Sequence, residues 1–316
     1  PYYLIAESDL NDARLIRPVE RGGYGLDAQW SDDFHHALHS LITGDRQGYY
    51  QDYGQCAQLA KAYNKTFIYD GQFAPHRDRF HGMPCLDCPP SQFVVCIQNH
   101  DQIGNQMKGD RLWQRISFEA LKLAAGSVLL SPYLPLLFMG EEYGETAPFM
   151  YFVSHSDPAL IKAVRQGRHQ EFEAFHYAED PPDPEGIETY LACKLQWELR
   201  QQGKHQKLWE LYHDLIHLRQ THPALQTKKR ENITATSDEA EQTITLHRWH
   251  EDNHLLCFLN FNKIPVSLIS PIERSGQKLL DSAEEKWCGS GSKLPEILAV
   301  KQELKIQPES FVVYQL

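Results

Sequence analysis

The sequence has few basic residues for its length. Among its 316 residues, 31 are Lys or Arg and 42 are Asp or Glu, so the formal net charge is -11. A surface with this balance does not attract the phosphates of nucleic acids or the headgroups of anionic membranes. We therefore expect neither a nucleic acid nor a membrane as a partner, and a ligand that is small or neutral.

The sequence also lacks the paired cysteines of a zinc ribbon or a disulfide framework. Its seven cysteines are odd in number and scattered, and only Cys85 and Cys88 form a C-x-x-C pair. No second pair stands at zinc-ribbon spacing, and no histidine pair completes a zinc finger. This usage predicts reduced thiols, a cytoplasmic location, and no metal or other cofactor. Whether Cys85 and Cys88 bind anything stays open.

No apolar run reaches the length of a membrane span without interruption. The uncharged run 123–140 contains Pro132 and Pro135, so it predicts a buried helix followed by a buried strand. No positively charged and apolar leader precedes the first strand-like run. The chain opens at Pro1 and becomes apolar almost at once, as expected for a start inside a domain.

Short apolar runs alternate with helical patterns from the start to about residue 140, which is the rhythm of a β/α protein with a parallel sheet. Each apolar run is typical of a strand that is buried on both faces. The predicted strands are Tyr2–Ala6, Thr66–Tyr69, Phe93–Gln98 and Leu134–Met139. The predicted helices between them are Asp32–Leu41, Cys56–Tyr63 and Phe118–Leu130.

A different pattern begins after about residue 228. A loop-rich stretch, 144–186, and two predicted helices, Tyr190–Gln201 and Gln206–Thr221, come before it. Residues 228–316 then alternate apolar and polar positions, which is typical of antiparallel strands with one buried face. We predict two domains, an α/β domain over 1–227 and a small antiparallel β-sandwich over 228–316.

Each predicted strand of the first domain is followed by polar side chains. The carboxyl ends of parallel strands form one edge, where barrels and open α/β sheets place their active sites. Carboxylates gathered there suit glycoside hydrolysis, which needs a proton donor and a carboxylate at the oxocarbenium-like centre. The alternative is that strand ends are simply solvated, and the pattern alone does not decide. The polar groups are Glu7-Ser8-Asp9, Asp70-Gly71-Gln72, Asn99-His100-Asp101-Gln102 and Gly140-Glu141-Glu142.

Two of these strand ends resemble motifs of the α-amylase family of glycoside hydrolases. Residues 93–101 are similar to its seventh-strand motif, and Ile5-Ala6-Glu7 is similar to its fifth-strand motif. Longer strings, 6–12, 25–36, 98–105 and 137–145, are similar to one branch of the family, which cuts the α-1,4 bond next to a terminal trehalose unit. The resemblance implies the second half, strands 5 to 8, of a (β/α)8 TIM barrel, followed by the β-sandwich.

The same resemblance implies a retaining hydrolase that acts on maltooligosyl trehalose or another α-1,4-glucan. Glu7 would protonate the leaving oxygen and later activate water, which requires it to be protonated before attack. Asp101 would stay ionised and bind sugar hydroxyls, and His100 would add a hydrogen bond. The other substrate-binding residues that it implies are Gln102, Asn105, Asp32, Asp33, Phe34, His35 and His36. Glu141 and Glu142 follow the last predicted strand, and we expect them to support the site without contacting the substrate.

Residues 31–39 allow three interpretations. His35 and His39 stand four apart, which could place both on one face of a helix as metal ligands. Ser31 could instead cap a helix whose first turn holds two acidic residues. The family resemblance implies sugar contact, which we rank first; it is compatible with capping.

The nucleophile that a retaining mechanism needs has no counterpart in this sequence. The family carries it in a G-x-R-x-D-x-x-x-H string before the acid/base Glu, and only six residues precede Glu7. The nearest imitation, 23–28, has Gly25 in place of Arg and follows Glu7. We expect the nucleophile and the other barrel half in an absent N-terminal part, and the chain alone to be inactive. A branching enzyme of the same family and a non-catalytic glucan-binding protein remain alternatives.

Overall fold

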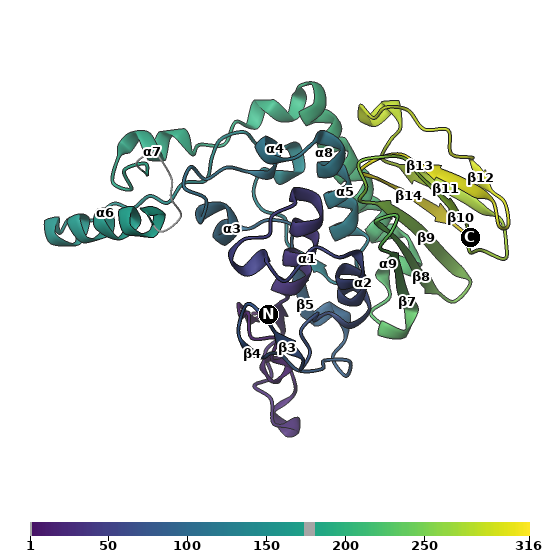
Figure 1. Ribbon diagram of the computed structural model, residues 1–316, viewed down its shortest axis with the longest axis horizontal. Coiled ribbons are helices and arrows are strands. Elements are labelled where there is room, and N and C mark those ends of the chain that lie inside the picture. Colours follow the sequence, from purple (N-terminus) through teal and green to yellow (C-terminus); the bar gives the residue numbers. More distant parts are fainter. Residues whose placement is uncertain (1, 174–180) are drawn as a thin grey trace. The chain divides into compact units, whose positions relative to one another are not determined.

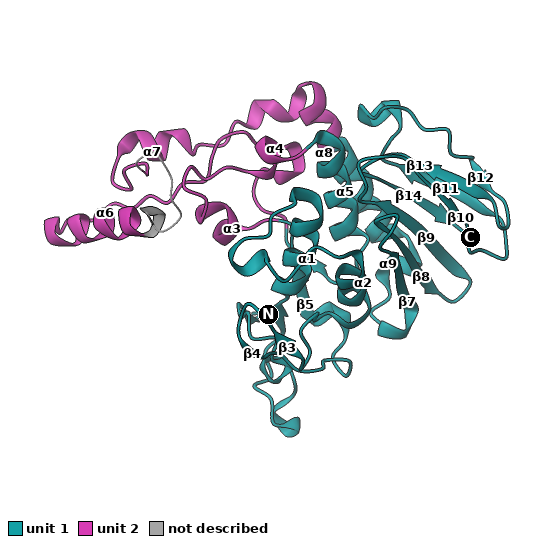
Figure 2. Cartoon of the chain, viewed as in Figure 1, with its two compact units in different colours: residues 1–97, 117–136, 210–316 teal, residues 98–116, 137–209 magenta. Residues whose placement is uncertain are grey.

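The computed structural model describes residues 2–173 and 181–316 (Figure 1). Its residues fall into two compact units (Figure 2). Unit 1 comprises residues 1–97, 117–136 and 210–316, and unit 2 comprises residues 98–116 and 137–209. Both predicted domains contribute to unit 1, and the predicted boundary between residues 227 and 228 stays a prediction.

A four-stranded parallel sheet lies in unit 1. Its strands, in spatial order, are β1 (Ile5–Ala6), β2 (Ala28–Trp30), β5 (Phe93–Val95) and β6 (Leu134–Pro135). Every neighbouring pair is parallel. The spatial order follows the chain order, with helical segments between the strands, as in one half of a (β/α)8 barrel. This confirms the predicted α/β class and three of the four predicted strands.

The prediction of a strand at Thr66–Tyr69 was wrong. The sheet contains Ala28–Trp30 instead. Thr66 has a φ of 74° at the end of a helix. The Phe67 N–H donates to the Lys65 carbonyl oxygen, and the N–H groups of Ile68 and Tyr69 donate to the Asp33 carboxylate. A strand must give such groups to a neighbouring strand. A buried side chain has satisfied them instead, so this apolar run remains a connection.

Three helices of unit 1 pack with the parallel sheet around an aromatic core. They are α1 (Asp32–Thr43), α2 (Cys56–Lys65) and α5 (Phe118–Leu129), close to the predicted ranges. The ring of Phe34 meets that of Tyr63 edge to face at 5.3 Å between centroids, and Phe67 meets Phe93 at 5.5 Å. Such pairs add about 0.5–1.5 kcal/mol to the burial of the rings themselves. A short hairpin of β3 (Phe73–Ala74) and β4 (Arg79–Phe80) follows α2.

The C-terminal part of unit 1 is an antiparallel β structure, as predicted. Its six-stranded sheet has the order β12 (Ile297–Leu298), β11 (Gly276–Asp281), β14 (Ser310–Gln315), β9 (Asn253–Asn260), β8 (Thr243–His250) and β7 (Ile233–Asp238). A second sheet pairs β10 (Val266–Ile269) with β13 (Glu303–Ile306). A buried cluster that includes Phe258, Leu304 and Tyr314 draws on both sheets.

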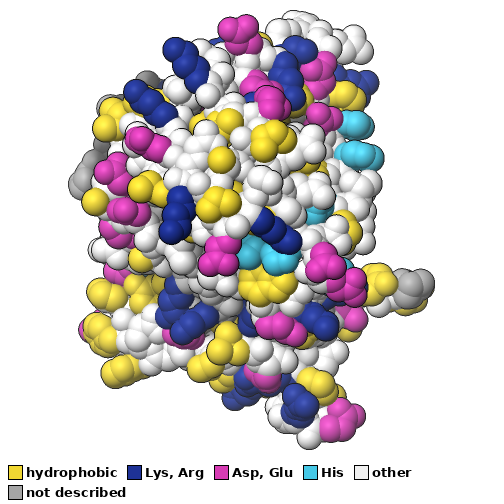
Figure 3. Space-filling view, turned by 90° about the vertical axis from the view of Figure 1, so that its right-hand side faces the viewer, with side chains coloured by type: hydrophobic (Ala, Val, Ile, Leu, Met, Phe, Trp, Pro, Cys, Tyr) yellow, Lys and Arg dark blue, Asp and Glu magenta, His cyan; other side chains and the backbone are white. Residues whose placement is uncertain are grey.

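Strand β7 of the six-stranded sheet contacts α2. The Asn64 side chain donates to the Ala235 carbonyl oxygen and accepts from the Ala235 N–H, both at 2.8 Å. On the face shown in Figure 3, acidic and basic side chains are interspersed with hydrophobic ones.

Unit 2 is helical and differs from two predictions. It holds α3 (His100–Gly104), α4 (Leu112–Arg115), α6 (Pro158–Glu173), α7 (Ile187–Ala192) and the start of α8 (Gly203–Thr221). The loop predicted over 144–186 contains α6, and its residues 174–180 lie outside the described residues. The helix predicted over 190–201 is broken: α7 ends at Ala192, and a 3-10 helix spans Trp197–Gln201. The Gln196 N–H in the break donates to Glu145.

A short helix, α9 (Pro223–Gln226), leads from α8 into the C-terminal sheets. Within residues 2–173 and 181–316, no helix combines the length and the apolar character that crossing a membrane requires.

Gly126 lets α5 approach the C-terminal sheet closely, which gives a first prediction. A Cβ at Gly126 would lie 2.6 Å from the buried Phe311 ring. We expect Gly126→Ala to lower the free energy of unfolding by about 1–3 kcal/mol, since overpacking outweighs the gain in helix propensity. Gly167→Ala in α6 is the matched control, because nothing lies within 4 Å of its Cβ. Urea unfolding checks both; equal effects would contradict the packing argument.

Candidate active site

The loop after β1 carries Glu7 and is fastened to the segment around the β3–β4 hairpin. Glu7 is exposed, directly beyond the end of its strand. Asp9 forms an ion pair with Arg77, with 2.9 Å between Oδ2 and Nη2, and its carbonyl oxygen meets His81 Nε2 at 3.0 Å. Burial raises the pKa of Asp9, but the hydrogen bond and charge of Arg77 outweigh it and hold the pKa below its usual range. Asp9 is therefore an anchor for this loop.

The buried end of the same loop is held by a contact between Asn11 and Asp33 of α1. The Asn11 side chain donates to Asp33 Oδ2 at 2.8 Å and to the Tyr69 carbonyl oxygen at 3.0 Å. Asp33 Oδ1 accepts from the Tyr53 hydroxyl at 2.6 Å, and burial raises the pKa of that hydroxyl. Both Asn11 and Asp33 are almost fully buried. Sequence reasoning did not single out Asn11, because a buried Asn in a loop leaves no periodic signal.

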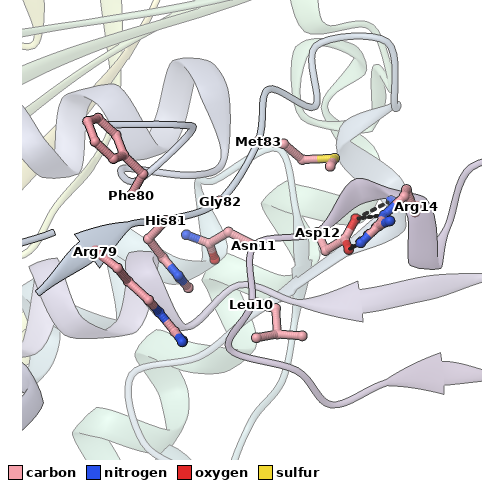
Figure 4. A pocket seen from close by; sticks show the side chains of 9 residues that line it. All are labelled: Leu10, Asn11, Asp12, Arg14, Arg79, Phe80, His81, Gly82 and Met83. Atoms are coloured by element: carbon pink, nitrogen blue, oxygen red, sulfur yellow. Dashed lines mark hydrogen bonds and ion pairs between the residues drawn. The ribbon is translucent and has the colours of Figure 1, made fainter. Parts of the chain in front are cut away.

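A pocket of about 360 Å³ opens beside this loop in unit 1 (Figure 4). The loop after β1 forms one wall, and β4 with the residues that follow it forms the other. One end is bordered by the ion pair of Asp12 and Arg14. The pocket therefore combines charged groups with apolar surface. The lining residues are Leu10, Asn11, Asp12, Arg14, Arg79, Phe80, His81, Gly82 and Met83.

Helix α1 holds five of the residues predicted to bind sugar, and it buries most of them. Phe34 and His35 are fully covered, and His36 is 7% exposed. Asp32 is half-buried. Phe34 belongs to the aromatic core, and His35 Nε2 meets the Tyr50 hydroxyl at 2.9 Å. The covered residues thus have packing partners within the protein, and their contact with sugar stays a prediction.

The two other interpretations of this helix can be compared with the structure. Ser31 occupies the N-cap position, but its hydroxyl makes no capping bond and donates to the Thr66 carbonyl oxygen at 3.3 Å. The capping role predicted for that side chain was therefore wrong. His39 Nε2 meets Asp45 Oδ2 at 2.8 Å, so His35 and His39 each direct a ring nitrogen at a protein oxygen.

Buried histidines on α1 predict a pH-dependent stability. Burial, with His39 and Arg77 nearby, lowers the pKa of His36 to about 3, and burial holds the pKa of His35 well below its usual range. Below about pH 6.5 the unfolded chain binds protons that the folded protein does not. The free energy of unfolding therefore decreases as the pH is lowered. We expect a loss of up to about 1.4 kcal/mol per pH unit for each histidine. Urea unfolding between pH 7 and 5 should show a shallower slope for His36→Gln, and an unchanged slope would contradict this.

In unit 2 the predicted residues follow β5 on the short helix α3. Asn99 caps this helix, because its Oδ1 accepts from the N–H groups of Asp101 at 2.9 Å and Gln102 at 3.2 Å. His100 and Asp101 are about half exposed, with 3.4 Å between Nε2 and Oδ1. Gln102 is half-buried, and Asn105 is exposed at the end of the helix. The cap fixes the backbone of His100 and Asp101. An Asn directly before the first turn of a helix is the sequence feature that indicates such a cap.

The segment after β6 is held by a buried arginine. Arg111 donates to the carbonyl oxygens of Met139 and Ala147, both at 2.7 Å. Glu141 is buried, and its Oε2 accepts from the Phe138 N–H at 3.1 Å. Burial lowers the pKa of Arg111, whereas nearby acidic groups, Glu145 foremost, act in the opposite direction. Glu141 thus contacts backbone within unit 2.

Comparison with known proteins gives consistent relatives. The chain is 43% identical over 291 residues to a malto-oligosyltrehalose trehalohydrolase of Rhizobium sp. (strain M-11), which covers 90% of this chain and 47% of the relative. It is 48% identical over 196 residues to the enzyme of that name from Saccharolobus solfataricus, covering 62% and 34%. The chain therefore spans about half the length, or less, of the curated relatives it matches. No family model matches the sequence.

Solved structures show the same fold. A protein from Salmonella typhimurium, described as a candidate α-amylase, superposes with a TM-score of 0.82 at 32% identity, over the whole of this chain and 51% of its own. The α-amylase from H. orenii superposes with a TM-score of 0.57 at 16% identity, over the whole of this chain and 53% of its own. The second likeness concerns the fold alone.

Proposed function

The chain is homologous to the C-terminal part of the malto-oligosyltrehalose trehalohydrolases, and on this premise we propose that it supplies the acid/base half of such an enzyme. The reaction is hydrolysis of the α-1,4 bond next to the terminal trehalose of maltooligosyl trehalose, which releases trehalose. The substrate is neutral, in keeping with the acidic chain. The observation that carries the proposal is the exposed Glu7 at the carboxyl end of a parallel barrel-type strand.

In the proposed reaction, Glu7 donates its proton to the glycosidic oxygen as the bond to the anomeric carbon breaks. A nucleophilic carboxylate, to which we assign no residue of this chain, bonds to that carbon. Glu7 then takes a proton from water as the water displaces the carboxylate, so the configuration is retained. The fastening of the loop at Asp9 and Asn11 supports this role, because an acid must be held within hydrogen-bond reach of its oxygen.

We propose that the residues of α3 bind the substrate. The exposed Asp101 would accept hydrogen bonds from sugar hydroxyls, and His100 would add one more. Gln102 and Asn105 would contribute amide groups. For α1, we propose sugar contact by Asp32 and His36 only, and a supporting role for Asp33, Phe34 and His35, which their burial favours.

All seven cysteines are free thiols, which supports the proposed cytoplasmic location.

The proposal can be tested on the full-length natural protein, with any residues that precede Pro1. Incubation with maltooligosyl trehalose should release free trehalose and a shortened malto-oligosaccharide. The control substrate is a malto-oligosaccharide of equal length without the trehalose terminus. Formation of α-1,6 branches from a glucan, with no trehalose, would identify a branching enzyme. Binding of the glucan without any turnover would identify a non-catalytic protein.

A further inference from the structure

Asp33 joins three segments that are distant in the sequence. Its Oδ2 accepts from the Asn11 side chain at 2.8 Å, from the Ile68 N–H at 2.6 Å and from the Tyr69 N–H at 2.9 Å. Its Oδ1 accepts from the Tyr53 hydroxyl at 2.6 Å. The side chain is buried, so four donors compensate the loss of hydration of one carboxylate. The two oxygens serve different neighbours.

The backbone of Asn11 is in the left-handed region, and contacts with neighbouring segments hold it there. Its φ is 53°, in the left-handed region. Its side chain reaches Asp33 and the Tyr69 carbonyl oxygen, and its own carbonyl oxygen accepts from the Met83 N–H at 3.1 Å. Gly82 packs closely on it, since a Cβ there would lie 3.0 Å from Asn11 Cβ and 1.9 Å from the Tyr69 carbonyl oxygen. These contacts therefore fix the backbone conformation of Asn11.

The loop that carries Glu7 is thus fixed at both ends. It leaves the sheet at Ala6 and is pinned again at Asn11, four residues after Glu7. Asn11 and Leu10 also form part of the pocket wall (Figure 4). A short segment between two fixed points has few conformations, which reduces the entropy lost in placing a catalytic group.

We propose that Asp33 is a positioning residue that acts through Asn11 to orient the Glu7 loop for proton transfer. The proposal rests on the proposed function in so far as Glu7 is the acid. It separates the roles of the two carboxylate oxygens. The bond from Asn11 to Oδ2 sets the loop, whereas the bond from Tyr53 to Oδ1 only stabilises the fold.

The test compares Asn11→Gly with Tyr53→Phe in the full-length natural protein. Glycine tolerates the φ of 53° but removes the side-chain bonds to Asp33 and to the Tyr69 carbonyl oxygen. We expect kcat to fall about 10–100-fold with KM changed far less, and the pH profile of kcat to shift, because the acid is misplaced. Tyr53→Phe removes one bond to the same carboxylate and should lower the melting temperature while kcat stays within about twofold. If the glycine variant does not fold, Asn11→Ser replaces it in the test. The serine side chain is too short to reach Asp33, so we expect the same fall in kcat.

Amide hydrogen exchange supplies a readout that is independent of activity. Exchange of residues 7–12 should quicken in Asn11→Gly and stay unchanged in Tyr53→Phe. If Asn11→Gly retains the natural kcat and the natural exchange of this loop, the proposal is overturned, even where Glu7→Gln is inactive. If the natural protein releases no trehalose, the proposed function fails, and the exchange result alone decides whether Asn11 fixes the loop.

Discussion

Replacing Glu7 by Gln should reduce trehalose release by the full-length natural protein about 10²–10⁴-fold, the range that a general acid contributes. The amide has the same shape as the carboxyl group but carries no proton that it can give to the leaving oxygen. Because Glu7 is exposed at the end of β1, its loss should leave the fold intact. The effect should therefore fall on kcat, measured as free trehalose at saturating substrate, with unfolding unchanged.

Glu141→Gln is the matched control for this substitution. Glu141 is also a glutamate in the segment that follows a strand of the parallel sheet, but it is buried and accepts a hydrogen bond from the Phe138 N–H. A glutamine retains an oxygen for that bond, so kcat should change far less than in Glu7→Gln. Equal losses in the two variants would mean that the acid has been assigned to the wrong residue.

The largest expected loss of stability comes from Arg248→Met. The Arg248 side chain lies between the C-terminal sheet and the helical layer of unit 1, 1% exposed. Its guanidinium donates to the carbonyl oxygens of Leu130 at 3.1 Å, Ser131 at 2.9 Å, Leu225 at 3.2 Å and Thr227 at 3.4 Å. Burial, with Arg219 nearby, lowers the pKa of the guanidinium to about 9.

The substitution should lower the free energy of unfolding by about 2–4 kcal/mol. Methionine fills much of the volume, but it leaves buried backbone carbonyl groups without that donor, and this cost exceeds the benefit of removing a buried charge. Arg274→Met is the control, because Arg274 is exposed in the connection between β10 and β11. Urea unfolding of both variants measures the difference. A loss no larger than that of Arg274→Met would show that the carbonyl groups find other partners.

Much of the fold follows from local patterns in the sequence. The apolar run at Phe93–Val95 forms a strand that is buried along its whole length, as uninterrupted apolar residues in a parallel sheet predict, whereas the strand at Leu134–Pro135 is only partly buried. Helix α8 was predicted to within three residues from leucines at helical spacing, and the alternation after residue 228 predicted antiparallel strands. Pro132 predicted that the helix in the uncharged run 123–140 ends before it, and α5 ends at Leu129.

The candidate site was predictable only in part, and the difference lies in burial. The strand-end motifs located Glu7, His100 and Asp101, all of which are exposed. The family resemblance of residues 25–36 also implied Asp33, Phe34 and His35, which the structure covers with the aromatic core and with Tyr50 and Tyr53. A run of polar residues after a strand says which groups are near an edge, but not which of them face solvent.

The composition alone determined the acidic character of this protein, and the local patterns determined its β/α and antiparallel parts. Only the tertiary structure decided that Thr66–Tyr69 is not a strand and that Ala28–Trp30 is. The backbone N–H groups of Ile68 and Tyr69 can bond either a neighbouring strand or the Asp33 carboxylate, which lies more than thirty residues earlier in the chain. Such a choice depends on which partner the folded chain brings within reach, and no local pattern records that.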